Sequence, residues 1–278
     1  MSQPQNELVE ILDLEQIELN LYRGLTPARQ GQRIYGGQVV AQALTAAYRT
    51  IEGRLCHSMH AYFIRPGDPS IPILFQVDQA RDGGSFSVRR VTAIQNGKQI
   101  FNLAASFQVP EEGFEHQDRA PDVTPPEDLL NEEQLREADG IPPRDRDWPV
   151  EVRPIDPQRR DQTEPMAPLY NVWFKARQSV GPDVAVNQCA LAYGSDMSLL
   201  DASLRPHPVP HGELQVASLD HALWFHRPSD FSDWHLYVQD SPSASGGRGF
   251  NRGSIFDRQG RLVASATQEA LIRHRPPC

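Results

Sequence analysis

The sequence predicts an α+β protein built from two tandem repeats, each a long buried helix wrapped by an antiparallel β-sheet. Two observations carry this prediction. Landmarks of the first half recur in the second half in the same order, and each half shows a helical pattern followed by strand-like runs separated by turn residues. At 278 residues the chain is long enough for two domains of roughly 100–200 residues each.

Four pairs of short segments mark the repeat, and the members of a pair lie 158 to 164 residues apart. A spacing that drifts this little favours a duplicated domain over chance. The paired segments are Tyr35–Val40 with Tyr193–Ser198, Tyr62–Pro66 with Trp224–Pro228, Gly83–Phe86 with Gly246–Phe250, and Asn96–Lys98 with Gln259–Arg261.

A helix is expected to open each repeat. In the first repeat, small or apolar residues follow the i, i+3, i+4, i+7 spacing, which predicts burial on almost every side: Val40, Ala43, Leu44 and Ala47. In the second repeat the helix is expected directly after the segment Tyr193–Asp196, with the apolar residues of Met197–Leu204 on its buried face. Asp196 would then stand at a helix start, where the first repeat has Gln38.

Three strands are expected to follow the helix of each repeat. Their runs are rich in β-branched and aromatic residues, and the turn dipeptides Asn96-Gly97 and Gln259-Gly260 separate the last two runs of each set. The expected strands are Ile71–Val77, Ser85–Ile94 and Gln99–Val109 in the first repeat, and Trp234–Gln239, Gly249–Asp257 and Arg261–Arg273 in the second. This order predicts two sheets side by side, each curled around a helix.

The stretch between the repeats has a different composition. Residues 111–168 hold 17 acidic and 7 basic side chains, and ten of the 24 prolines lie between Pro121 and Pro168. Such density of charge and proline is typical of a solvated connector without a site, with one short helix within Glu127–Asp139. The predicted organisation is a first repeat over 1–112, an acidic proline-rich linker over 113–165 and a second repeat over 166–278.

Composition and missing motifs exclude several classes of protein. The net charge of -9 argues against a nucleic-acid partner, and no apolar run approaches the ~18 residues of a membrane span. The N-terminal segment lacks a secretory signal pattern. The sequence contains no serine-hydrolase elbow, phosphate-binding loop or histidine pair with metal spacing. The three distant cysteines favour neither disulfides nor a zinc site: Cys56, Cys189 and Cys278. We therefore expect a cytoplasmic protein with no metal and no cofactor.

Three polar residues of the second repeat are candidate site residues. Asp196 could cap its helix or accept a proton from water, with the helix-end N–H groups of Gly36–Gln38 or Ser195–Asp196 facing an oxyanion. Ser218, at the start of a predicted strand, and Gln268, within the last strand, are its candidate partners, although each could equally be an ordinary strand residue. An aspartate at a helix start is expected to keep a low pKa.

Histidines could act beside these residues. His57 is the expected neighbour of the site. Strand alternation would put Ser218 and Asp220 on one face and His221 on the other, so that Ser218 would lack a base and be a poor nucleophile.

Segments typical of one enzyme family run through nearly the whole chain. They are Leu21–Gly24, Tyr35–Val40, Tyr62–Asp68, Arg81–Phe86, Ala105–Gln108 and Gly113–Gln117 in the first half, and Tyr193–Asp196, Ser218–Pro228 and Gln268–Glu269 in the second. In these segments the sequence resembles the type II (TesB-like) family of bacterial acyl-CoA thioesterases, which are double hotdog proteins. The resemblance implies the double hotdog fold and the hydrolysis of acyl-CoA to free fatty acid and CoA.

The resemblance also implies roles for individual residues. The family's water-orienting trio of Asp, Thr or Ser, and Gln maps onto Asp196, Ser218 and Gln268, with serine where threonine is common. Surface basic residues such as Arg89 and Arg90 are expected to meet the CoA phosphates. Because family members assemble further, a homo-oligomer (dimer or tetramer) is expected, and the absence of a C-terminal Ser-Lys-Leu address points to the cytoplasmic branch.

Two other functions stay open at this point. Other hotdog proteins hydrate enoyl-CoA, but a hydratase is expected to pair an aspartate with a histidine along one helix, and no histidine closely follows Asp196. A non-catalytic acyl-CoA binder is the third possibility. Release of free thiol from acyl-CoA separates all three.

Overall fold

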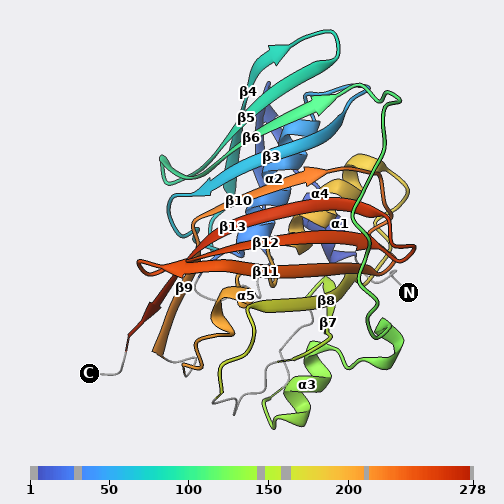
Figure 1. The fold of residues 1–278 in the computed structure, drawn as a ribbon. Helices are drawn as coiled ribbons and strands as arrows, with labels where there is room; N and C mark the ends of the chain where they lie inside the picture. The colour runs from blue at the N-terminus through green and yellow to red at the C-terminus, as the bar shows by residue number, and fades with distance from the viewer. Residues whose placement is uncertain (1–5, 28–32, 143–147, 158–163, 210–212, 276–278) are drawn as a thin grey trace, which may run out of the picture.

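The computed structural model describes residues 6–27, 33–142, 148–157, 164–209 and 213–275 (Figure 1). Cys278, one of the three cysteines weighed above, lies outside the described residues, whereas Cys56 and Cys189 are buried free thiols. No described helix is both long enough and apolar enough to cross a lipid bilayer.

The first half of the described chain contains the expected helix and strands. Its elements are α1 (Glu7–Leu12), β1 (Glu15–Glu18), β2 (Leu21–Gly24), α2 (Gly36–Tyr48), β3 (Leu55–Phe63), β4 (Ile73–Asp82), β5 (Phe86–Gln95) and β6 (Lys98–Gln108). Asn96 and Gly97 both have positive φ, 48° and 69°, as the tight hairpin turn between β5 and β6 requires. The prediction of a helix buried on almost every side is confirmed, since nearly all residues from Gly37 to Ala47 are buried.

The second half repeats this order with additions. Its elements are β7 (Val150–Pro154), β8 (Leu169–Ala176), α4 (Val184–Ser195), α5 (Asp201–Leu204), β9 (Leu214–Ser218), β10 (Asp220–Phe225), β11 (His235–Ser245), β12 (Arg248–Asp257) and β13 (Leu262–His274). The three strands expected here correspond to β11, β12 and β13, so the predicted meander is confirmed.

The predicted position of the second helix is wrong. α4 ends at Ser195, directly before Asp196, and only the single turn α5 follows within the expected segment. The Asp183 side chain caps the start of α4 by accepting a hydrogen bond from the Val186 N–H at 3.0 Å. Because α4 is buried on all sides at its centre, its sequence lacks the amphipathic period by which helices are usually found.

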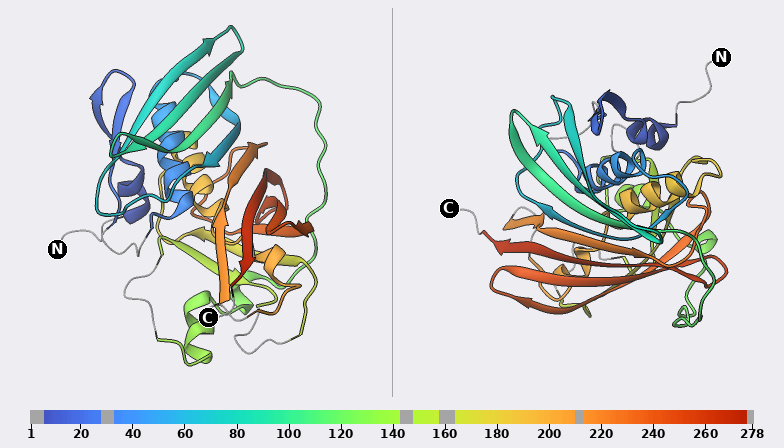
Figure 2. Two further views of the ribbon diagram at one scale, coloured as in Figure 1. Left: turned by 90° about the vertical axis from the view of Figure 1, so that its left-hand side faces the viewer. Right: turned by 90° about the horizontal axis from the view of Figure 1, so that it is seen from above.

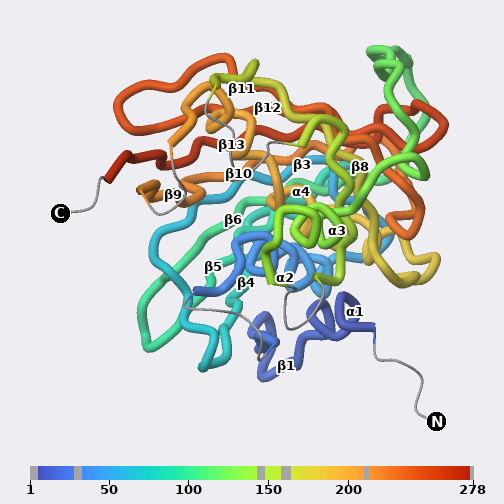
Figure 3. The backbone as a smooth tube through the Cα atoms, turned by 90° about the horizontal axis from the view of Figure 1, so that it is seen from below, coloured from blue at the N-terminus to red at the C-terminus, as the bar shows by residue number. Residues whose placement is uncertain are grey.

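All described strands belong to one antiparallel sheet, in the order β1-β2-β4-β5-β6-β3-β10-β13-β12-β11-β8-β7, with β9 also paired with β13. The sheet curves around α2 and α4, which pack against each other inside it (Figures 2 and 3). The two halves meet where β3 pairs with β10. This continuous sheet is the double hotdog fold that was expected.

A local twofold axis relates the two halves. His60 of β3 pairs with Ala222 of β10, and these two residues are themselves equivalent at the repeat spacing of 162 residues, so the axis passes between them. Because the axis also exchanges α2 and α4, the N-terminal end of α2 lies beside the C-terminal end of α4. The three landmark pairs in the strands agree with this axis, whereas the first pair, which equates Gln38 with Asp196, is wrong.

The acidic segment after β6 runs down the outside of the second half (Figure 1). It carries η1 (Pro126–Asp128) and α3 (Glu132–Ala138), and α3 confirms the short helix expected within Glu127–Asp139. Its apolar side chains, including Val123 and Leu129, pack on a cluster with Trp173 and Trp234, and the Trp173 indole N–H donates to the Thr124 carbonyl at 2.9 Å. The segment therefore covers the outer face of the sheet, unlike a solvated connector.

Candidate active site

Asp196 is the residue directly after α4, at the pole of the helix where carbonyl groups point outward. Its side chain is 5% exposed. The expectation that Asp196 begins a helix is therefore wrong, and the Ser195–Asp196 turn does not offer the free helix-end N–H groups that were expected there.

Two further side chains converge on the Asp196 carboxylate. The Gln268 amide Nε2 donates to Asp196 Oδ1 at 2.5 Å, and the Ser218 hydroxyl donates to the same oxygen at 3.2 Å. Gln268 is fully buried within β13. Ser218 is the last residue of β9, where a strand start was predicted. The structure thus brings together the three residues that the sequence singled out.

The remaining wall of this site comes from the first half. Gly36 and Gly37 open α2, and their lack of side chains lets this helix end approach α4 closely. A Cβ on Gly36 would lie 2.6 Å from Asp196 Oδ2, and one on Gly37 would lie 2.4 Å from the Tyr193 carbonyl oxygen. Sequence reasoning named these glycines only as one possible source of N–H groups. Their role as the contact between the halves was missed, because no local pattern shows which helix end faces which.

Burial raises the pKa of the Asp196 carboxyl from its usual value of 3.8 to about 6, although hydrogen bonds from Gln268, Ser218 and the Gly37 backbone act to lower it. The expectation of a low pKa is wrong because it assumed an exposed helix start. A carboxylate with this pKa is ionised at neutral pH and is a stronger base than an exposed aspartate.

Hydrogen bonds hold the end of α4 in place. The Tyr35 hydroxyl donates to the Tyr193 carbonyl at 2.8 Å, and the Tyr237 hydroxyl donates to the Ser195 carbonyl at 3.1 Å. His221 Nε2 lies 2.9 Å from Ser195 Oγ, and burial lowers the pKa of His221 to about 4, so this imidazole is neutral at physiological pH. These contacts fix the backbone from which Asp196 projects.

The predicted strand alternation around Ser218 is wrong. Leu219 interrupts the ladder between β9 and β10, so that Ser218 and His221 both reach inward, toward Asp196 and Ser195 respectively. Asp220 instead accepts a hydrogen bond from the Glu269 N–H at 2.8 Å. The imidazole of His221 is bonded to Ser195 and not to Ser218.

Several other expected neighbours lie elsewhere. Gln38 donates to the Leu25 carbonyl at 3.2 Å. His57 Nε2 lies 2.8 Å from Ser106 Oγ in the first-half sheet, and no contact of this histidine among the described residues reaches Asp196. Arg89 is 2% exposed and pairs with Asp82, so it is not available to CoA phosphates. Within the described ranges, no three His, Cys, Asp or Glu side chains are grouped as a metal site would require.

Comparison with known families covers both halves of the chain. Residues 26–108 match the family model of the acyl-CoA thioesterase N-terminal domain, and residues 144–271 match that of acyl-CoA thioesterase. Acyl-CoA thioesterase 2 of Haemophilus influenzae is 41% identical over 98% of this chain and 99% of its own length. Human acyl-coenzyme A thioesterase 8 is 38% identical over 96% of this chain and 88% of its own.

Solved structures agree with these relatives. Acyl-CoA thioesterase II TesB2 from Mycobacterium marinum has 43% sequence identity and a TM-score of 0.81, covering 96% of this chain and 98% of its own. A protein with the hotdog fold from Alicyclobacillus acidocaldarius is 19% identical, with a TM-score of 0.80 over 99% of this chain and 100% of its own, and supports the fold alone. With both halves matched and the relatives aligned over nearly their full length, the chain is an enzyme that belongs to the acyl-CoA thioesterase family.

Proposed function

We propose that this enzyme hydrolyses acyl-CoA thioesters through a water molecule held and activated by Asp196, Ser218 and Gln268. One observation carries the proposal. Gln268 donates through Nε2 to the Asp196 carboxylate, while its fully buried Oε1 has no hydrogen-bond partner among the described residues. A buried acceptor of this kind normally has a partner, and a water held between Gln268 and Asp196 would supply it.

The proposed reaction is a direct attack by water. The water oxygen adds to the thioester carbonyl carbon while its proton passes to the Asp196 carboxylate. The tetrahedral intermediate then collapses, the carbon–sulfur bond breaks, and the proton returns to the departing CoA thiolate. The products are a carboxylic acid and free CoA. The pKa of about 6 supports Asp196 as the base, because proton transfer is most efficient near the working pH.

The first half would stabilise the developing oxyanion. The first turn of a helix carries N–H groups that have no partner within the helix, and its positive pole attracts negative charge. α2 presents this turn, with Gly36 and Gly37, directly against Asp196. Because the Gly37 backbone already donates to Asp196, we assign the oxyanion site to the other N–H groups of the first turn of α2.

Ser218 is proposed to orient the water and not to attack the substrate. Its hydroxyl donates to Asp196, and the neighbouring imidazole of His221 is bonded to Ser195. A serine nucleophile needs a base that accepts its proton and is itself held in place. The Asp196 carboxylate already accepts a hydrogen bond from the Gln268 amide. It is therefore better placed to accept a proton from a water held between Asp196 and Gln268 than to accept one from Ser218.

The proposal is tested by the release of free thiol from a panel of acyl-CoAs. Asp196→Asn should lose roughly 10²–10⁴-fold in turnover, the usual contribution of a general base. Asp201→Asn is the matched control, since burial also raises the pKa of Asp201, to about 7, and its side chain, on α5, makes no hydrogen bond to the trio among the described residues. Equal turnover in wild type and Asp196→Asn would refute the proposal.

A further inference from the structure

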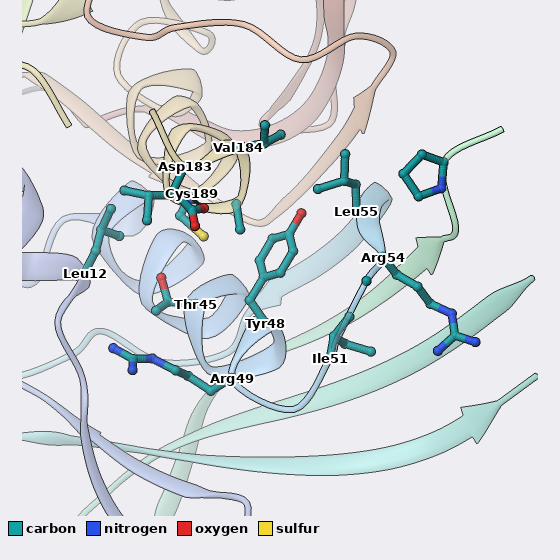
Figure 4. A pocket seen from close by; sticks show the side chains of 14 residues that line it. Leu12, Thr45, Tyr48, Arg49, Ile51, Arg54, Leu55, Asp183, Val184 and Cys189 are labelled. Carbon is teal, nitrogen blue, oxygen red and sulfur yellow. Dashed lines mark hydrogen bonds between the residues drawn. The ribbon is translucent and has the colours of Figure 1, made fainter. Parts of the chain in front are cut away.

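A cavity of about 750 Å³ opens at the opposite end of the α2–α4 pair from Asp196 (Figure 4). Both halves line it, with Tyr48 and Ile51 from the first half and Val184 and Ala185 from the second. The α4 residues that line it run from Val184 to Cys189, and Cys189 precedes Asp196 by seven residues, about 10 Å along the helix axis at 1.5 Å per residue.

The local twofold axis makes this cavity the counterpart of the Asp196 site. At the strand spacing of 162 residues, Cys56 is the equivalent of Ser218, and both residues lie directly before an interruption of the ladder. Gln268 of β13 pairs with Asn251 of β12. The first-half equivalent of Asn251 is Arg89, which pairs with Ala105 of β6. Ala105 therefore takes the place of Gln268.

The helix ends are related in the same way. When the starts of α2 and α4 are equated, Tyr48 takes the place of Asp196. The Tyr48 hydroxyl accepts the Cys56 N–H at 2.7 Å, where Asp196 accepts the Ser218 hydroxyl. Tyr48, Cys56 and Ala105 thus replace the trio. No carboxylate stands in the place of Asp196 here. The nearby Gln188 amide is already engaged, since its Oε1 accepts from the Tyr48 hydroxyl and its Nε2 donates to the Cys56 carbonyl at 3.1 Å, so this end cannot activate water as proposed for Asp196.

The walls of the cavity suit a hydrocarbon chain. Ile51, Leu55 and Val184 supply apolar side chains, and Figure 4 shows Leu55 and Tyr48 facing the same space. A Cβ on Gly53 would meet no atom within 4 Å, so the space beside it is open. The volume lies within the ~300–1,000 Å³ of ordinary small-molecule sites.

The rim of the cavity favours an anionic head group. Arg54 donates to the carbonyls of Gly83 and Gly84 at 2.7 and 3.0 Å, and no carboxylate of the described residues lies within ion-pair distance of it. Its buried Nε also has no partner among the described residues. Arg49 also lies on the rim, where its guanidinium pairs with the exposed carboxylate of Asp13 at 3.3 Å.

One carboxylate lies on this rim as well. Asp183 caps α4 by accepting the Val186 N–H at 3.0 Å, so its charge is directed to the helix start. Arg49 is paired with Asp13, and Asp183 is engaged at the helix start. Arg54 is thus the guanidinium at this rim that has no carboxylate partner among the described residues, and it is the group suited to an anionic head group.

We propose that this cavity binds the hydrocarbon chain of an anionic acyl ligand without hydrolysing it. Free fatty acid and acyl-CoA share this chemistry. The choice of ligand class rests on the proposed function, because the cavity is the twofold counterpart of the site proposed to hold an acyl chain.

Photolabelling of the full chain tests the inference. The probes are hexadecanoic acid with a diazirine at the chain end and the thioether analogue of its CoA ester, which cannot be hydrolysed. Labelled peptides are mapped by mass spectrometry. Label from either probe within residues 45–55 or 183–189 supports the proposal and shows which head group is accepted, whereas label confined to the neighbourhood of Asp196 overturns it.

Two variants with matched controls sharpen the test. Ala185→Trp fills the cavity and should reduce labelling there at least tenfold while labelling near Asp196 is retained, and Ala138→Trp, on the exposed surface of α3, should change neither. Arg54→Gln should weaken fatty-acid binding about tenfold, and Arg65→Gln, at an exposed arginine that also donates to a backbone carbonyl, should not. Cavity labelling unaffected by both Ala185→Trp and Arg54→Gln would overturn the inference.

Thiol release measured on the same preparations separates this inference from the proposed function. Cavity labelling with no hydrolysis of acyl-CoA would refute the proposed function alone. Normal hydrolysis with an unlabelled cavity would refute the second site alone.

Discussion

At the scale of single residues, the chemistry depends on how burial and hydrogen bonding balance at Asp196. Burial raises the pKa of this carboxyl to about 6. Since the base must be ionised, kcat/KM should fall tenfold per pH unit below about pH 6 and be level above it. A profile measured by thiol release between pH 4.5 and 8 checks this, and an acid limb near pH 4 would contradict it.

The same pKa shift predicts a pH dependence of stability. The folded pKa of Asp196 lies above its unfolded value of 3.8, so folding favours the protonated form. Stability is therefore fully present below about pH 3.8 and is lost as the pH rises through about 6, by about 3 kcal/mol for a shift of about two units. Wild type should lose stability relative to Asp196→Asn between pH 4 and 7. Thermal unfolding of both proteins measures the difference, and a constant gap in Tm would contradict it.

Ser218 gives a second prediction at this scale. If its hydroxyl only orients water, Ser218→Thr should keep activity within about tenfold of wild type, because threonine retains the donor to Asp196. Ser218→Ala removes a hydrogen bond to a charged group and should lose roughly ten- to a hundredfold. Turnover with rapid mixing and intact-protein mass spectrometry checks both, and an acyl group trapped on Ser218 would refute the water mechanism.

At the scale of elements, the close approach of α2 to α4 builds the site. Gly37→Ala would place a Cβ 2.4 Å from the Tyr193 carbonyl and push the two helix ends apart. We expect a loss of about 1–3 kcal/mol in stability and at least tenfold in turnover. Gly84→Ala is the control, since a Cβ there meets no atom within 4 Å. Wild-type Tm and turnover in Gly37→Ala would show that the approach is not required.

Sequence analysis found the elements whose pattern depends on neighbouring residues, and it missed the helix whose burial depends on distant ones. The hairpin strands were found because Asn96-Gly97 and Gln259-Gly260 mark turns that depend only on neighbouring residues. α4 was missed because it is buried all round, and its start at Asp183 was not recognised as a cap. That error placed Asp196 at the wrong helix pole and gave the wrong pKa.

The residues of the candidate site could be predicted only in part. Asp196, Ser218 and Gln268 were candidates from their places in the predicted elements, but their grouping as a trio came from family resemblance, since 72 residues separate Asp196 from Gln268 and no local pattern links them. The close contact of Gly36 and Gly37 with the end of α4 could not be predicted, because it depends on how the whole sheet pairs the two halves.

At the scale of the whole molecule, the pairing of β3 with β10 makes one sheet of two repeats. The two halves should therefore unfold in one cooperative transition, with equal calorimetric and van't Hoff enthalpies. Hydrogen exchange should show α2 and α4 losing protection together. Two resolved transitions, or early exchange of one helix alone, would contradict this. Assembly into a dimer or tetramer stays a prediction that sedimentation can test.

The axis between His60 and Ala222 also bears on how such a chain can vary over generations. In a dimer of identical single-repeat chains, one codon specifies both ends of the helix pair, so replacing a carboxylate at one end replaces it at the other. In a fused chain the two ends have separate codons. Tyr48 at one end is thus compatible with Asp196 at the other, a combination that two identical chains cannot adopt.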